Sequence, residues 1–363
     1  MFLQNPFTGA FGLNIGDLSI KLMQLERRKN LRGHNYYHVK ELRTAPLSPG
    51  CIVNGEIQQP EMIRKKILYL LGREGRYKAI KSPWVVADLP EPKTFLKVIT
   101  LDANPDQVTE EDVVYQAKKH LPFEIEETYL DWKVLGSNSD SNHAKVLVGA
   151  VPKVTADSYT YLLESVGLTP LALEIEVLSI ARALVPEHSP EEKASAILDL
   201  GATRSSLIFF DHEGVKFSTH LNFSGEILTT AIAQEMKLDY DRAETLKIER
   251  GITYSKQDPK YLKIISKFTD ELVSEVKKAI SFYQEHFAET DPIQEVNLCG
   301  GSASLKNLPE TISRKLKVRA TVLPLLPVLK FPGQLATHAS GSSLASVVGL
   351  ALRAAQNPFL LKD

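Results

Sequence analysis

Two stretches of the sequence, half a chain apart, share one pattern of apolar and polar positions. In residues 196–210 an apolar run ends at Asp199, a turn of small residues follows at Gly201, and a second apolar run begins. Short apolar runs bounded by turn residues predict two buried strands joined by a tight turn. Such a turn can cradle an anion, and the carboxylate can hold a hydrated divalent cation. The alternative is an ordinary hairpin whose Asp bonds only to its own turn.

The same design recurs near the N-terminus, in residues 11–25. Asn14 takes the place of Asp199, and Gly16 takes the place of Gly201 in the same register. Self-similarity over half a chain predicts a duplicated α/β fold, with a nucleoside triphosphate between the two halves. The polar residues that follow in this copy are Asp17, Ser19 and Lys21.

Two further motifs follow in the second half of the chain. Residues 295–305 predict a strand that runs into a Gly-Gly pair, where the backbone can lie flat against a base or ribose. Residues 241–247 predict a helix on which an acidic and a basic residue, three apart, share a face. The residues of interest in these motifs are Gly300, Gly301, Ser302, Glu244 and Lys247.

Apolar residues at helical spacing predict the other helices. Thr109 opens a capping box, and Ser224 is a good N-cap. The apolar stripe of residues 261–287 fits core packing or a partner surface, and core packing is the commoner use. The basic residues 26–33 predict a solvated hairpin tip rather than a contact with lipid or a partner. The expected helices are 59–74, 109–120, 157–166, 174–184, 224–236, 261–287 and 342–355, with strands at 84–87, 95–101, 129–135, 145–151 and 215–221.

Composition sets the size class and excludes some partners. A chain of 363 residues exceeds the size at which one core usually stops growing, so two lobes are expected. Lys and Arg number 43 against 44 Asp and Glu, which gives no global field for nucleic acid or anionic membrane. Cys51 and Cys299 show no metal-ligand spacing, and no apolar run approaches a membrane span or signal peptide. We therefore expect a cytosolic protein.

The four motifs, in this order, resemble those of the actin-like ATPases, which include actin, the Hsp70 chaperones and the division protein FtsA. An inserted segment makes the resemblance more specific, because it is similar to one group within these ATPases. Residues 120–135, HLPFEIEETYLDWKVL, 157–170 and 174–184 are similar to consecutive motifs of the PilM-like pilus assembly proteins. This resemblance covers nearly the whole chain.

The resemblance implies a two-lobed actin-like ATPase fold, with duplicated RNase H-like lobes and a small inserted α+β subdomain in the first lobe. The first lobe would comprise residues 1–88, the inserted subdomain 89–167, and a connecting helix 168–193 that includes a polar linker at 186–193. The second lobe would span 194–340, and a C-terminal helix at 341–363 would return to the first lobe.

The resemblance also implies ATP and Mg²⁺, with phosphates between residues 14–19 and 201–205, and Mg²⁺ near Asp199. Glu176 would position water or the metal, and Asp199 and Glu176 are therefore the catalytic candidates. Glu244 would meet the ribose, with Lys247 nearby. The nucleotide-binding candidates are Asn14, Gly16, Asp17, Ser19, Lys21, Gly201, Ala202, Thr203, Ser205, Glu244, Lys247, Gly300, Gly301 and Ser302.

Asn14 is the departure from the family pattern, which usually has Asp at this position. A neutral amide removes one charge from the metal site, so we expect ATP hydrolysis to be weak or absent. A benign substitution in a protein whose nucleotide is structural is the alternative.

The resemblance implies a cytoplasmic scaffold of type IV pilus assembly that binds the cytoplasmic N-terminal peptide of PilN, a single-span membrane protein. It would lie at the inner membrane through protein partners. The alternatives are a polymerising FtsA-like division protein and a small-molecule kinase on the same fold. FtsA-like chains end in a basic amphipathic helix, whereas residues 357–363 are too short and not basic. The peptide is expected in an apolar groove beside the inserted subdomain, whose aromatic residues are Phe95, Tyr115, Phe123, Tyr129 and Trp132.

Overall fold

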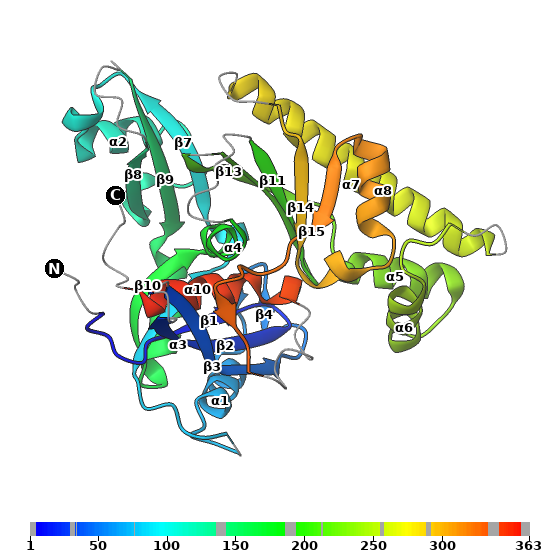
Figure 1. The fold of residues 1–363 in the computed structure, drawn as a ribbon, viewed down its shortest axis with the longest axis horizontal. Coiled ribbons are helices and arrows are strands. Elements are labelled where there is room, and N and C mark those ends of the chain that lie inside the picture. The colour runs from blue at the N-terminus through cyan, green and yellow to red at the C-terminus, as the bar shows by residue number, and fades with distance from the viewer. Residues whose placement is uncertain are drawn as a thin grey trace. The chain divides into compact units, whose positions relative to one another are not determined.

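The computed structural model describes residues 5–29, 33, 35–75, 77–135, 143–185, 194–211, 213–254, 258–287, 292–332 and 341–356. These residues form two compact units, one within 1–187, 325–339 and 345–363, the other within 188–324 and 340–344 (Figure 1). The predicted linker at 186–193 and the tail at 357–363 lie outside the described residues.

The first unit contains a mixed sheet with strand order β10-β6-β1-β2-β3-β16. Strands β1, β2 and β3 pair antiparallel, whereas β6 runs parallel to both β1 and β10. The ends of β1 and β6 therefore meet at one edge of the sheet. The strands are β1 Phe11–Ile15, β2 Ser19–Lys29, β3 Asn35–Pro46, β6 Trp84–Leu89, β10 Thr169–Ile175 and β16 Leu329–Lys330, beside a small hairpin of β4 Ile52–Val53 and β5 Glu56–Ile57.

Helices cover both faces of this sheet. On one face, α1 (Pro60–Leu70) and α3 (Lys153–Ser165) contribute to the same hydrophobic core as β1 and β2. On the other, α10 (Ala345–Ala355) packs against β1, β2 and α4 (Glu176–Leu184), as Figure 1 shows. The C-terminal helix is thus part of the first unit, with all but three of its eleven residues buried.

A small sheet of β7 (Phe95–Leu101), β9 (Ala144–Pro152) and β8 (Thr128–Leu135) also belongs to the first unit. Strand β9 lies between the other two and pairs antiparallel with both. Helix α2 (Glu110–Ala117) packs against this sheet, and its predicted capping box is confirmed, because Thr109 and Asp112 exchange hydrogen bonds. Three short 3₁₀ turns, Glu91–Lys93, Pro105–Gln107 and Ile125–Glu127, complete the segment.

The second unit contains strands in the order β15-β14-β11-β12-β13. The hairpin β11–β12 is antiparallel, and β14 runs parallel to β11 and to β15. The strands are β11 Ser195–Leu200, β12 Ser205–Asp211, β13 Gly214–Leu221, β14 Glu295–Cys299 and β15 Arg319–Val322, and the helices are α5 Gly225–Met236, α6 Tyr240–Arg250, α7 Pro259–His286 and α8 Leu308–Leu316, with 3₁₀ turns at Gly301–Ser304 and Gly341–Leu344.

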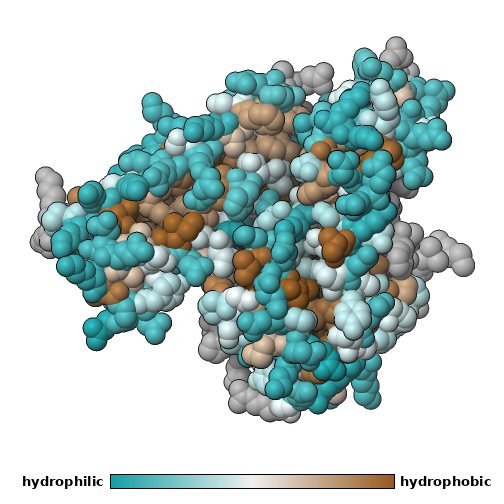
Figure 2. Space-filling model, turned by 180° about the vertical axis from the view of Figure 1, so that it is seen from behind, coloured by the Kyte–Doolittle hydropathy of each residue, from teal (hydrophilic) through white to brown (hydrophobic). Residues whose placement is uncertain are grey.

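Core packing accounts for the apolar stripe of α7. Its buried residues include Ile265, Phe268, Leu272 and Val276, which belong to the main core of the second unit. The prediction of a core-facing stripe is therefore confirmed. On the face drawn in Figure 2, hydrophobic side chains emerge in several separate groups among hydrophilic ones. Among the described residues, every helix is too short or too polar to cross a membrane.

Several predicted boundaries were wrong, for local reasons. The first helix was expected to run to residue 74 but ends at Leu70, since Gly72 has a φ of +70° that breaks the helix. The residues from Glu26 to Lys29 were assigned to a basic turn, yet they extend β2 by pairing with β3. Glu174 was placed on a helix but lies in β10, and α4 begins at Glu176.

Candidate functional site

The first hairpin, β1–β2, forms as predicted. Every residue of β1 is buried, and Asn14 lies opposite Lys21 in the register of the hairpin. The Gly16 amide donates to the Ser19 carbonyl at 3.1 Å, which closes the turn. The turn residues 16–19 are only partly buried, so a ligand can reach their backbone.

A carboxylate from a different strand meets this hairpin. Asp88, near the end of β6, accepts a hydrogen bond from Asn14 Nδ2 at 2.5 Å and one from the Ile15 amide at 2.9 Å. Both Asn14 and Asp88 are buried, with 4% and 3% of their surface exposed. The parallel pairing of β1 with β6 brings these two residues together.

Glu176 completes a small polar cluster in the first unit. Its Oε1 accepts from Asn14 Nδ2 at 3.3 Å and from Ser346 Oγ of α10 at 3.0 Å. Burial raises the pKa of the Asp88 carboxyl to about 7, and the nearby charge of Glu176 acts in the same direction. The amide of Asn14 lies between these two acidic groups and donates to both.

The second hairpin, β11–β12, also forms as predicted. Asp199 lies opposite Ser206, and Gly201 starts the turn, where a Cβ would overlap the Arg204 carbonyl oxygen. The carbonyls of Gly201 and Ala202 accept hydrogen bonds from the first amides of α5 at 3.1 and 2.8 Å. The helix N-terminus is therefore engaged by the hairpin itself.

The Gly-Gly loop lies directly beside Asp199. Gly300 has a φ of +86°, and a Cβ there would come within 2.6 Å of Asp199 Oδ1. Cys299, on the parallel strand β14, directs its Sγ at the same oxygen at 3.4 Å. At Gly301, by contrast, a Cβ would meet no atom within 4 Å. The loop is thus packed against Asp199 on one side and open on the other.

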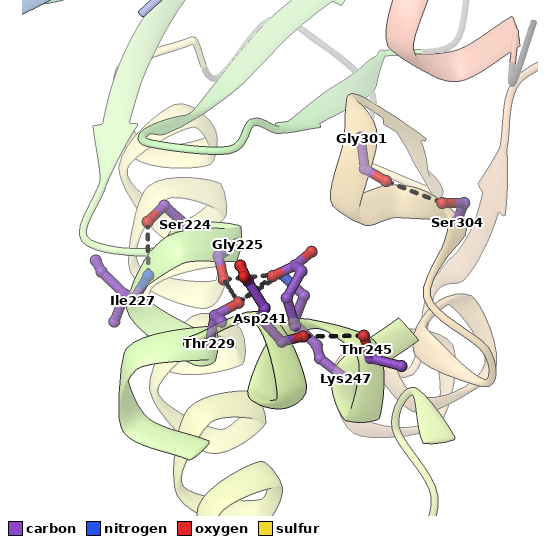
Figure 3. A network of polar contacts seen from close by, with 10 residues as sticks. Ser224, Gly225, Ile227, Thr229, Asp241, Thr245, Lys247, Gly301 and Ser304 are labelled. Carbon is purple, nitrogen blue, oxygen red and sulfur yellow. Dashed lines mark hydrogen bonds and ion pairs between the residues drawn. The ribbon is translucent and has the colours of Figure 1, made fainter. Parts of the chain in front are cut away.

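Lys247 belongs to a network that joins α5 to α6 (Figure 3), and Glu244 pairs with it. Lys247 is buried, and its Nζ lies 2.7 Å from Glu244 Oε2, 2.8 Å from Thr229 Oγ1 and 3.0 Å from the Gly225 carbonyl. A Cβ at Gly225 would come within 2.6 Å of Ser302 Oγ, so this part of the network is closely packed. Glu244 keeps about a third of its side chain exposed. Lys247 therefore positions the helices, and Glu244 is the member that a ligand can reach.

Each unit thus brings together part of the predicted set. In the second unit, Asp199, the hairpin turn, the Gly-Gly loop and the α5–α6 network are linked by the contacts above. Ser205 fits less well, since its Oγ is buried and has no hydrogen-bond partner among the described residues. The hollow at α8 and β15, lined by Pro309, Arg314 and Val322 among others, contains none of the predicted residues.

Asp88 is the residue that sequence reasoning missed. The segment WVVADL was taken as a strand ending at Ala87, which left the carboxylate outside the element. An Asp that follows a buried apolar run is the pattern that identified Asp199, so the same criterion would have found it.

Known proteins share this architecture. The sequence model of the family described as type IV pilus assembly protein PilM matches residues 12–355. A chain from a PilM–PilN type IV pilus biogenesis complex is 24% identical over 97% of this chain and 100% of that chain, with a TM-score of 0.79. MreB5 of Spiroplasma citri bound to AMPPNP is 12% identical over 96% of each chain, with a TM-score of 0.52.

The ethanolamine utilization protein EutJ from Carboxydothermus hydrogenoformans is 15% identical over 94% of this chain and 88% of that chain, with a TM-score of 0.50. A search of curated protein sequences found no match. These likenesses confirm the predicted fold class, the actin-like ATPase fold.

The two glycines of the loop should tolerate substitution very differently. Gly300→Ala adds a side chain at a positive φ and against Asp199, so it should lower the free energy of unfolding by about 1–3 kcal/mol. Gly301→Ala, the matched control, should change it by less than about 1 kcal/mol, because its Cβ side is open. Urea denaturation of both variants measures the difference, and equal losses would contradict the packing described for Gly300.

Asp88 should make the protein less stable as the pH rises from about 4 to about 7. The unfolded carboxyl loses its proton near pKa 3.8, whereas the folded one keeps it to about pH 7. The native state binds more protons in this window, so the contribution of Asp88 is fully present below the unfolded pKa and is lost as the pH rises.

Urea denaturation of wild type and Asp88→Asn at several pH values tests this expectation. The wild type should lose stability relative to the variant across the window. Parallel pH profiles would show that the pKa of Asp88 is not raised in the folded protein.

Proposed function

Because this chain belongs to the PilM family of type IV pilus assembly proteins, we propose that it is a cytoplasmic scaffold that binds the N-terminal peptide of a PilN-like membrane protein. The observation that carries the proposal is the likeness along almost the whole length to a protein solved in a PilM–PilN complex. The partner's membrane span would hold this chain at the inner membrane, so the chain needs no lipid-binding element of its own.

The composition of the small sheet's core supports a docking surface in the first unit. Its buried residues are all aliphatic, and none of its five large aromatic residues is fully buried. Trp132 packs partly against this core, whereas Tyr115 and Tyr129 are exposed. Exposed aromatic side chains are enriched where proteins bind partners.

We place the peptide at the corner between β8 and α3. Val154, Asp157 and Tyr161 lie three and four residues apart, on one face of α3. Asp157 accepts a hydrogen bond from the hydroxyl of Tyr129 on β8 at 3.2 Å. Val154, Tyr161 and Tyr129 are 76%, 75% and 49% exposed. We call these three residues the α3–β8 surface.

Strand β8 gives this surface a way to bind backbone as well as side chains. Among the described residues, β8 pairs with β9 alone and ends the small sheet. An extended peptide can add to such an edge through main-chain hydrogen bonds, while neighbouring side chains select its sequence. The α3–β8 surface would provide that selection.

We also propose that the protein binds ATP with Mg²⁺. The residues of the second unit fit a nucleotide: a partly exposed carboxylate, Asp199, lies near the end of the buried strand β11, and the open side of Gly301 leaves room for a flat group. Asp199 would hold the metal, since Mg²⁺ prefers oxygen ligands and keeps several waters. Glu244 would accept hydrogen bonds from the ribose. The structure of MreB5 bound to AMPPNP supports nucleotide binding on this fold.

ATP hydrolysis should be weak, and the nucleotide would then stabilise the scaffold rather than drive turnover. In the first unit, Asn14 and Asp88 bond to each other, and both are buried. Neither side chain is therefore placed as an exposed base for an attacking water.

Asp199→Ala should weaken the binding of ATP in the presence of Mg²⁺ by at least about tenfold, a common cost of removing a group that positions a metal. Glu235→Ala, which removes an exposed carboxylate from α5 of the same unit, is the control and should leave the affinity unchanged. Isothermal calorimetry measures both variants. Unchanged affinity in Asp199→Ala would remove this residue from the site.

Tyr161→Ser should weaken the binding of the PilN-like peptide by about tenfold or more, since interface aromatics commonly contribute over 1 kcal/mol. Tyr115→Ser, on α2, is the matched control, because Tyr115 is 70% exposed and lies outside the α3–β8 surface. Fluorescence anisotropy with the partner's first two dozen or so residues measures both.

Two outcomes would contradict different parts of this proposal. Equal effects of the two Tyr variants would move the peptide away from the α3–β8 surface. Absence of binding to the peptide, and also to the full-length partner in a membrane, would refute the scaffold.

A further inference from the structure

The duplicated hairpins differ in which strand carries the carboxylate. In the second unit, the hairpin strand β11 carries Asp199, and the parallel neighbour β14 carries Cys299 opposite it. The thiol lies 3.4 Å from Asp199 Oδ1 and donates to it. One strand thus supplies the acid, and the adjacent strand supplies a hydrogen-bond donor.

In the first unit the acid and the donor are exchanged between the hairpin strand and its parallel neighbour. Here the hairpin strand β1 carries the donor, Asn14, and the parallel neighbour β6 carries the acid, Asp88. These two residues follow the last registered pair of the strands, Leu13 and Ala87. Both units therefore have one carboxylate and one donor at the same place in the sheet.

We propose that acid and donor have exchanged strands in the first unit, so that Asp88 supplies the carboxyl group of the first hairpin and Asn14 positions it. The inference rests on the proposed binding of ATP. Asp88 lies below the surface and acts through its charge and through the Ile15 amide at the start of the turn, to which it bonds at 2.9 Å. Asn14 is a positioning residue, because its amide donates to both Asp88 and Glu176.

The geometry explains why an amide stands at position 14. Asn14 Nδ2 carries two protons, and the carboxylates of Asp88 and Glu176 lie within reach of this nitrogen at 2.5 and 3.3 Å. An Asp at this position would remove both donors and place a third carboxylate in a buried cluster. Asn14→Asp should therefore harm the protein unless Asp88 is neutralised as well.

A double-mutant cycle tests the exchange without nucleotide. Asn14→Asp should raise the equilibrium constant for unfolding at neutral pH by at least about tenfold, the size expected for an unpaired buried charge. Adding Asp88→Asn to this variant should reverse at least half of the rise in the logarithm of the equilibrium constant for unfolding. Adding Glu176→Gln instead should recover less, because Glu176 is the more distant of the two carboxylates.

The nucleotide assay tests what Asp88 does beyond holding the fold. Asp88→Asn, a substitution of equal size, should weaken the affinity for ATP with Mg²⁺ by about five- to tenfold, and change the affinity measured in EDTA by less than about twofold. Asp102→Asn removes an exposed carboxylate of the same unit and should change neither value. A purely structural Asp88 would affect both conditions alike.

The outcomes separate this inference from the proposed function. If wild type binds no ATP, the nucleotide proposal fails, and the stability cycle still decides whether Asn14 and Asp88 are coupled. If wild type binds ATP but Asn14→Asp alone is as stable as wild type, the exchange of acid and donor is overturned. Equal dependence on Mg²⁺ in wild type and Asp88→Asn would overturn the role of Asp88 in the first hairpin.

Discussion

The site in the first unit depends on how closely α10 packs against α4 and against the mixed sheet of that unit. A Cβ at Gly349 would overlap the carbonyl of Ser179, and a Cβ at Gly12 would overlap the backbone of the same helix. Backbone atoms cannot rotate away as side chains can, so these contacts fix the position of α10 tightly. This packing carries Ser346 to Glu176, at 3.0 Å. The polar cluster of Asn14, Asp88 and Glu176 is therefore held by residues from both ends of the chain.

Two neighbouring buried acids show how strongly such packing controls charge. Burial alone would raise the pKa of Glu174, but Arg182 and Arg353 surround its carboxylate and hold the pKa below its ordinary value. Asp88, on the adjacent strand, has an amide partner in place of a guanidinium, and its pKa rises to about 7. The first acid ties β10 to α4 and α10, and removing one partner of such a buried pair is costly. The second remains able to change its charge near neutral pH.

The sequence was sufficient to predict the elements that neighbouring residues specify. It was insufficient to predict contacts between residues that only the pairing of distant strands brings together. Ser224 caps α5 and Thr109 caps α2 as predicted, because a cap depends on three or four adjacent residues. The hairpins were found for the same reason. A local pattern marks Asp88 as well, but its contact with Asn14, 74 residues away, could not be predicted, because only the parallel pairing of β6 with β1 brings the two together. Lys247 was expected near a ribose, yet it is buried between two helices, a tertiary contact that its spacing from Glu244 does not indicate.

Helix α3 shows how a scaffold can bind a partner without disturbing its fold. Its inner face places Tyr159 and Leu163 in the main core of the first unit, and the Tyr159 hydroxyl bonds to the Gly55 carbonyl. Its outer face exposes Val154 and Tyr161. Strand β9 runs directly into this helix, so a continuous stretch of chain joins the small sheet to the main core. A peptide that docks on the outer face would meet side chains that are already positioned, and such preorganisation reduces the entropy lost on binding.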